Sequence, residues 1–86
     1  MRLDLVLKQA AIIKRRTVAK TLAENGHIEI NGKISKPSSD VKEGDILTLH
    51  LGKRLLKVKI SFIKRGSKEI PNYVIITNTT DDVKSW

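Results

Sequence analysis

The apolar residues of the first 24 positions recur at helical spacing. Leu3, Val6, Leu7 and Ala10 fall on one stripe, which predicts a short helix at about residues 4–11. A second stripe predicts a helix that begins at Arg16 or Thr17 and runs to about Glu24; it consists of Val18, Ala19, Leu22 and Ala23. Asn25-Gly26 follows, and glycine readily adopts the left-handed conformation that ends many helices. We therefore predict two N-terminal helices joined by a basic connection.

From residue 27 onward apolar residues recur at every second position, the spacing of a β-strand. Residues 27–30 alternate, Asn31-Gly32 is a strong hairpin signal, and residues 33–35 return as a second strand. Further strands are predicted at 46–51, 55–63 and 73–77, with a polar loop at 64–72. Two helices followed by a small antiparallel sheet make an α+β fold. We expect one domain over residues 1–77 and a C-terminal tail at 78–86.

Composition narrows the possible functions. The chain has 86 residues, no cysteine and only three aromatic residues, Phe62, Tyr73 and Trp86. Disulfides, thiol nucleophiles and cysteine-based zinc sites are therefore excluded, and stacking on aromatic rings is not the main binding device. No arrangement of residues suggests a catalytic site, a metal or a cofactor, so we expect a non-enzymatic protein. The 17 Lys and Arg against 9 Asp and Glu give a formal charge of +8, which favours a polyanionic partner.

The positive charge is concentrated at the N-terminal end. Residues 1–20 carry six basic and one acidic side chain, a net +5, whereas the other 66 carry eleven basic and eight acidic, a net +3. On a helical wheel Arg16 and Lys20 lie together on the outer face, one turn apart. Thr17 stands at the helix start, where unpaired amides favour an anion. This arrangement predicts a phosphate-binding surface.

The alternative is that this basic face is only solvated. Three consecutive cations at a helix start, with basic flanks and little acid nearby, favour binding instead. Lys33 and Lys36 extend the basic area beyond the hairpin. A further group of basic residues is interpreted as the solvent-exposed face of a strand and its turn: Lys53, Arg54, Lys57 and Lys59.

Four segments, in order, carry a family resemblance: RLDLVL, IKRRTVAK, ENGHIEINGK and KPSSDVKEGD. Together they resemble the RNA-binding domain named after small-subunit ribosomal protein four, the S4 domain, over about residues 1–51. The whole chain is similar to the RqcP family of short bacterial ribosome-associated quality control proteins. It is also similar to bacterial heat-shock protein fifteen, which carries a longer basic C-terminal extension.

The resemblance implies an alpha-L motif in which a helix pair docks its basic face on structured RNA. It further implies binding to a large ribosomal subunit with an obstructed peptidyl-tRNA, with contacts to rRNA and to the tRNA. There the protein supports C-terminal alanine tailing by an RqcH-type factor. Arg2 and Arg16 are implied as the central contacts, with Asp4 steering both arginines and capping its helix. The full predicted RNA-binding set is Arg2, Lys8, Lys14, Arg15, Arg16, Thr17, Lys20, Lys33 and Lys36.

No apolar stretch reaches the length of a transmembrane helix and the N-terminus lacks the pattern of a signal peptide, so we expect a cytoplasmic protein that does not bind membranes. The resemblance implies that it is associated with the ribosome, and we expect a monomer off the ribosome. The chain departs from the family pattern at Leu5, Val6, Ala11 and His27, which puts the affinity in question more than the binding mode. Within RNA binding, the alternatives are a heat-shock-protein-fifteen-like recycling factor without a tailing role and a general binder of structured RNA. Outside it, an anionic membrane surface or an acidic protein partner remains open.

Overall fold

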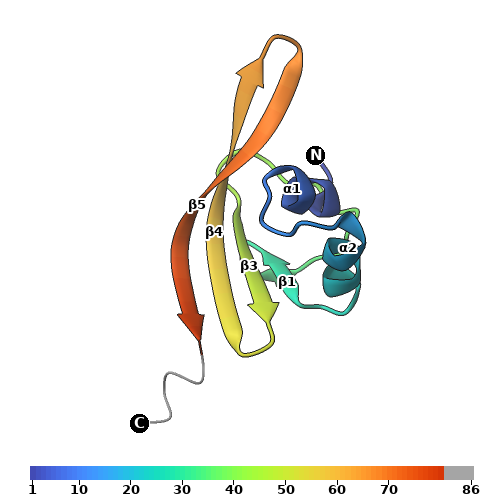
Figure 1. Ribbon diagram of the computed structural model, residues 1–86, viewed down its shortest axis with the longest axis vertical. Helices are drawn as coiled ribbons and strands as arrows, with labels where there is room; N and C mark the ends of the chain where they lie inside the picture. The colour runs from blue at the N-terminus through green and yellow to red at the C-terminus, as the bar shows by residue number, and fades with distance from the viewer. Residues whose placement is uncertain (81–86) are drawn as a thin grey trace.

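The computed structural model describes residues 1–80 and contains two helices and one five-stranded antiparallel sheet. Helix α1 (Leu3–Gln9) and helix α2 (Arg16–Glu24) lie on the same side of the sheet (Figure 1). The strands follow in the order β2-β1-β3-β4-β5 across the sheet. Their bounds are β1 (Ile28–Ile30), β2 (Lys33–Ile34), β3 (Ile46–Leu51), β4 (Arg54–Arg65) and β5 (Lys68–Thr80). The predicted α+β class is confirmed.

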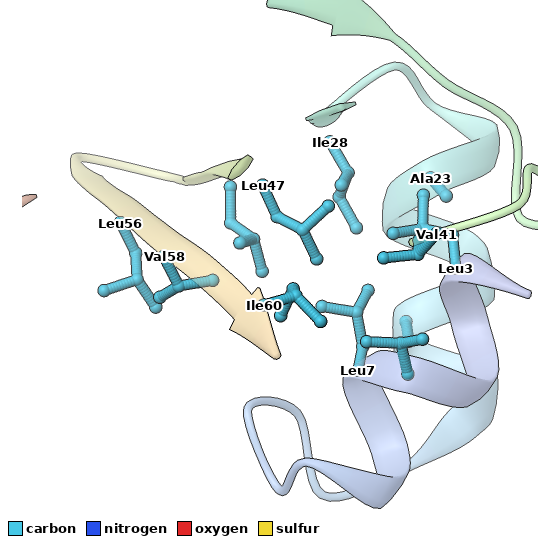
Figure 2. Close-up of a cluster of buried hydrophobic side chains, with 12 residues drawn as sticks. Leu3, Leu7, Ala23, Ile28, Val41, Leu47, Leu56, Val58 and Ile60 are labelled. Carbon is cyan, nitrogen blue, oxygen red and sulfur yellow. The ribbon is translucent and has the colours of Figure 1, made fainter. Parts of the chain in front are cut away.

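The hydrophobic core lies between the two helices and one face of the sheet (Figure 2). Leu7 of α1 lies beside Ile60 of β4 there, Leu3 lies beside Val41, and all four side chains are buried. Helix α2 contributes the small residues Ala19 and Ala23 to this core. Val18, which the apolar stripe assigned to the buried face, is instead 45% exposed. Helix α2 is therefore rotated so that its alanines face inward, with Leu22 partly buried beside them and Val18 at the surface.

Both helices end in the same hydrogen-bonded motif, but with different residues at its left-handed position. After α2, Gly26 has φ 78, and the amides of Gly26 and His27 bond back to the carbonyls of Ala23 and Leu22. This confirms the predicted glycine cap. After α1, Ala11 takes the same position with φ 61. The amides of Ala11 and Ile12 bond to Lys8 and Leu7, so α1 ends at Gln9 rather than at residue 11.

Backbone carbonyls, not a side chain, satisfy the first amides of α1. The Leu3 amide donates to the Ser39 carbonyl at 2.8 Å, and the Asp4 amide donates to the Pro37 carbonyl at 3.2 Å. The predicted capping role of Asp4 is therefore wrong: the N-cap residue is Arg2, and no side chain caps the helix. These bonds hold the 36–41 loop against the start of α1.

Asp40 holds the first residue against the same loop. The amino group of Met1 donates to Oδ1 of Asp40 at 2.7 Å, and the Val41 amide donates to the Met1 carbonyl at 2.8 Å. The hydrogen bond from the Met1 amino group, together with the positive charge of that group, lowers the pKa of the Asp40 carboxyl from its ordinary 3.8. The start of the chain and the 36–41 loop thus form one bonded unit.

Strands β4 and β5 are much longer than the sequence predicts. The predicted polar loop at residues 64–72 is wrong, because β4 continues to Arg65 and β5 begins at Lys68. Pro71 lies inside β5, where an edge strand tolerates its missing N–H group. Residues 78–80, predicted as the start of the tail, continue β5; the rest of that tail lies outside the described residues.

Strand β5 is an edge of the sheet and carries an uncharged run. No charged side chain occurs between positions 70 and 80, although 30% of the whole chain is charged. Val74, Ile75 and Ile76 are 65%, 51% and 49% exposed. A register shift between Lys57 and Val58 of β4 marks a bulge in the pairing with this strand. One long side of β5 is left unpaired.

Candidate RNA-binding site

A buried carboxylate lies between two arginines that are far apart in sequence. Asp4 is 2% exposed, while the side chains of Arg2 and Arg16 are 52% and 48% exposed. The Nε of Arg2 is 3.4 Å from Oδ1 of Asp4, and the Nε of Arg16 is 3.4 Å from Oδ2. Asp4 thereby links the start of α1 to the start of α2 and brings both guanidinium groups to one surface.

The contacts of Asp4 are long, which leaves both arginines free to bind elsewhere. Its Oδ2 accepts hydrogen bonds of 3.5 Å from Arg2 and 3.4 Å from Arg16. Its Oδ1 is buried without a hydrogen-bond partner, although the Arg2 Nε lies within ion-pair distance. Because both arginines are half exposed, solvent screens their side of each pair. Asp4 positions the arginines without using up their donors.

The N-terminus of α2 adds backbone donors to the same surface. Arg15 is the N-cap residue and makes no side-chain capping bond, so the first amides of the helix have no partner within it. Thr17 is exposed in the first turn, and the positive end of the helix dipole lies there. Together, these groups favour a phosphate or another anion at this point.

Two shallow hollows join these groups to other cations. One is lined by Arg2, Asp4, Arg16, Thr17 and Lys20. The neighbouring one shares Arg2 and Lys20 and adds Glu24, Lys36, Pro37 and Ser38. The 36–41 loop brings Lys36 to the helices, as its bonds to α1 require. Sequence reasoning missed Pro37 and Ser38, because nothing in the pattern shows where this loop docks. It also gave little weight to Glu24, which lines the basic hollow from the outer face of α2.

The other predicted residues do not line these hollows. Lys14 and Arg15 are exposed in the connection just before α2, and Lys8 is exposed in the last turn of α1. Lys33 is exposed on β2, the other edge strand of the sheet. The structure therefore groups five predicted residues into one surface, the Arg2–Arg16 surface, defined as Arg2, Arg16, Thr17, Lys20 and Lys36 around Asp4.

The Arg2–Arg16 surface suits phosphate recognition better than chemistry. Its donors are two guanidinium groups, two ammonium groups, a hydroxyl and helix amides, and a planar guanidinium binds two phosphate oxygens at once. Within residues 1–80 the structure shows no group of three or more side chains that could hold a metal ion. No helix in that part of the chain is long and apolar enough to cross a membrane.

Comparison with known sequences places the surface inside a matched family region. The S4 domain family matches residues 1–47, which contain all of the surface. The chain is 49% identical over 69 residues to an RQC P-site tRNA stabilizing factor of Bacillus subtilis, covering 80% of each chain. It is 46% identical over 69 residues to the protein of that name in Streptococcus pneumoniae, covering 80% of this chain and 78% of the relative.

A more distant relative and a solved structure share the fold. The chain is 30% identical over 74 residues to small ribosomal subunit protein uS4 of Paracoccus denitrificans, covering 85% of this chain and 36% of that protein. Heat Shock Protein 15 of Vibrio cholerae, solved as a trimer, superposes with a TM-score of 0.69 at 30% identity. That match covers 86% of this chain and 81% of the solved one.

Proposed function

The chain belongs to the S4 domain family and, within it, to the RQC P-site tRNA stabilizing factors, and from this premise we propose that it binds a large ribosomal subunit carrying an obstructed peptidyl-tRNA. It is a non-enzymatic, cytoplasmic RNA-binding factor of ribosome-associated quality control. The observation that supports this most is the pairing of Arg2 and Arg16 around buried Asp4. That pairing gives two half-exposed guanidinium groups a fixed spacing on a small rigid body.

The Arg2–Arg16 surface contacts rRNA and tRNA mainly through phosphates. The grooves of A-form RNA hide most base edges from side chains, so shape and backbone charge dominate. Lys8, Lys14, Arg15 and Lys33 add weaker contacts around the surface. By holding the tRNA in the P site, the protein supports C-terminal alanine tailing by an RqcH-type factor on the same subunit. Off the ribosome it is a monomer.

Binding of this kind weakens steeply with salt. Neutralising about four to six phosphates gives a log–log slope of roughly −3 to −5 for affinity against salt concentration. We expect this slope in a titration of the wild-type protein against purified tRNA-bearing large subunits. A flat response would contradict phosphate contacts.

Sedimentation of lysates through sucrose gradients tests the proposal and its binding face. Wild type should travel with tRNA-bearing large subunits, and Arg16→Ala should remain at the top of the gradient. Lys59→Ala is the matched control, because Lys59 is an exposed cation between the buried residues Val58 and Ile60, on the sheet face away from the helices. Nuclease treatment should release the wild type, and thermal melts should show that each variant folds. Equal effects of the two substitutions would mean that another face binds RNA.

The similarity to Heat Shock Protein 15 supports a second candidate, a ribosome recycling factor without a tailing role. Both candidates predict the same sedimentation result. An assay of alanine addition to stalled nascent chains separates them, since tailing should fall without this protein only under the first. Unchanged tailing, with persistent subunit binding, would favour the second.

A further inference from the structure

The β4–β5 hairpin extends well beyond the rest of the molecule. In Figure 1 it projects past α1 at one end of the long axis, and the molecule measures 50 × 23 × 22 Å. The last bonds that tie β4 to the body involve the turn at residues 42–45: the Gly44 amide donates to the Ile60 carbonyl and the Phe62 amide to the Glu43 Oε1, both at 2.8 Å. Beyond Phe62 the described residues show no hydrogen bond between the hairpin and the body, although Lys64 and Glu69 border a hollow that Met1, Asp40 and Glu43 also line. We call residues 63–70 the finger.

The finger ends in exposed cations that face one another. Its tip is the turn Arg65-Gly66-Ser67-Lys68, with Gly66 at φ 63, the pattern of a tight hairpin turn. Arg65 and Lys68 are direct cross-strand partners. Lys64 adds a third exposed cation, and its own cross-strand partner is the exposed Glu69. Like charges placed directly opposite each other destabilise a hairpin. Among the described residues no acid lies within ion-pair distance of any of the three.

The other end of β4 shows that a turn of this kind does not require opposed cations. There Gly52, also at φ 63, and Lys53 connect β3 to β4. The closing pair is Leu51 and Arg54, and the Arg54 Nε is satisfied by the Asn78 side chain at 2.8 Å. The Gly52-Lys53 turn thus has the same glycine conformation, but its closing pair contains a single cation, Arg54, which is hydrogen-bonded. The opposed cations of the finger lower the stability of the hairpin, and the turn does not need them in order to form. Destabilising features of this kind concentrate at functional sites.

We propose that the finger tip is a second RNA-contacting site, in which Lys64, Arg65 and Lys68 bind phosphates of an RNA segment other than the one on the Arg2–Arg16 surface. An anion between Arg65 and Lys68 removes their repulsion. The small residues Gly66 and Ser67 let the backbone approach a phosphate closely. A narrow ribbon enters the wide, shallow minor groove of an RNA helix or the space between two helices. This inference rests on the proposed function, since it gives the same protein two contacts on one RNA assembly.

Cysteine-directed cleavage of rRNA tests the finger directly. The chain has no cysteine, so a single engineered one carries an iron chelate that generates hydroxyl radicals at a known place. Ser67→Cys places the probe at the finger tip, and Thr21→Cys places it on an exposed position of α2 near the Arg2–Arg16 surface. Lys53→Cys is the matched control, because it occupies the same position in the Gly52-Lys53 turn. Each labelled protein is bound to purified tRNA-bearing large subunits, and its retention is checked by sedimentation.

We expect Ser67→Cys and Thr21→Cys to cleave two different segments of RNA, with cuts at least about fivefold above those from Lys53→Cys. Cleavage from Thr21→Cys alone, with Ser67→Cys no stronger than Lys53→Cys, would overturn the finger site and leave the proposed function standing. The same holds if the probe at position 67 labels only a protein of the complex. Failure of all three labelled proteins and of the wild type to sediment with the subunits would overturn the proposed function and the finger site together.

Discussion

The Arg2–Arg16 surface and the finger present cations in opposite ways. In the first, a carboxylate that is 2% exposed lies between two arginines and is held by helices packed on the core. In the second, cross-strand partners Arg65 and Lys68 repel each other at the end of a ribbon that leaves the core behind. The difference shows two routes to an anion site. One organises the donors before binding, and the other stores a repulsion that binding relieves.

The largest expected effect follows from removing the organising charge. Asp4→Asn should weaken binding to tRNA-bearing large subunits about tenfold, or about 1.4 kcal/mol, although the change makes the protein more positive. The neutral amide attracts the two guanidinium groups less, so their spacing is lost. Binding is measured by titration at fixed salt.

Asp45→Asn is the matched control, because it makes the same charge change in the 42–45 turn, which contributes no residue to the Arg2–Arg16 surface. It should alter affinity by less than about twofold. Tighter binding of Asp4→Asn would show that Asp4 acts as a repulsive charge toward phosphate and not as a positioning residue.

A smaller effect is expected from neutralising the finger. The triple change Lys64→Gln, Arg65→Gln and Lys68→Gln should weaken binding about three- to fivefold and flatten the salt slope by about two. The melting temperature should change little, because the repulsion between Arg65 and Lys68 disappears while the favourable pair of Lys64 and Glu69 is lost as well. Lys53→Gln, Lys57→Gln and Lys59→Gln together remove the same charge from elsewhere on the protein. If both triples weaken binding equally, the finger contributes only through net charge.

The smallest expected effect concerns the connection that joins α1 to α2. Ala11 has φ 61 where Gly26 occupies the equivalent position after α2. Ala11→Gly should raise the free energy of unfolding by about 0.5–1 kcal/mol, since an L side chain is strained there. Chemical denaturation measures this, and RNA binding should stay unchanged. A loss of stability would mean that the entropy of the added glycine in the unfolded chain outweighs the relieved strain.

The helical half of the molecule could be predicted from sequence, and the finger could not. The bounds of helix α2 were predicted closely because apolar periodicity and the Asn25-Gly26 stop mark them, although the periodicity placed Val18 on the wrong face. The outer part of β4 and β5 has no core to face, so no alternation of apolar and polar residues marks it. Its strands are specified by the Gly66-Ser67 turn and by backbone pairing. Pro71 does not interrupt the pairing, because an edge strand accommodates a residue without an N–H group.

The residues of the Arg2–Arg16 surface were predicted, and the family resemblance implied the pairing of Asp4 with both arginines, but the burial of Asp4 and the docking of the 36–41 loop were not predicted. Charge clustering and the helix start identify Arg16, Thr17 and Lys20. The burial of Asp4 could not be predicted, because an acid in an apolar stripe is ordinarily exposed or capping. The position of the Asp4 carboxylate depends on a hydrogen bond from Arg16, which lies twelve residues further along the chain. Which residues of the 36–41 loop join the surface depends on backbone bonds to α1 that leave no mark on the sequence pattern.

The uncharged edge of β5 has a consequence for the colloidal behaviour of the protein. An unpaired strand edge without charges is a template for pairing with another molecule, and long-range repulsion from a net charge of +8 keeps such molecules apart in dilute buffer. At 0.1 M added salt, the repulsion between charges more than about 10 Å apart is largely screened. The ionic strengths that release the protein from RNA thus also lower its barrier to self-association, so every salt titration needs light scattering beside it.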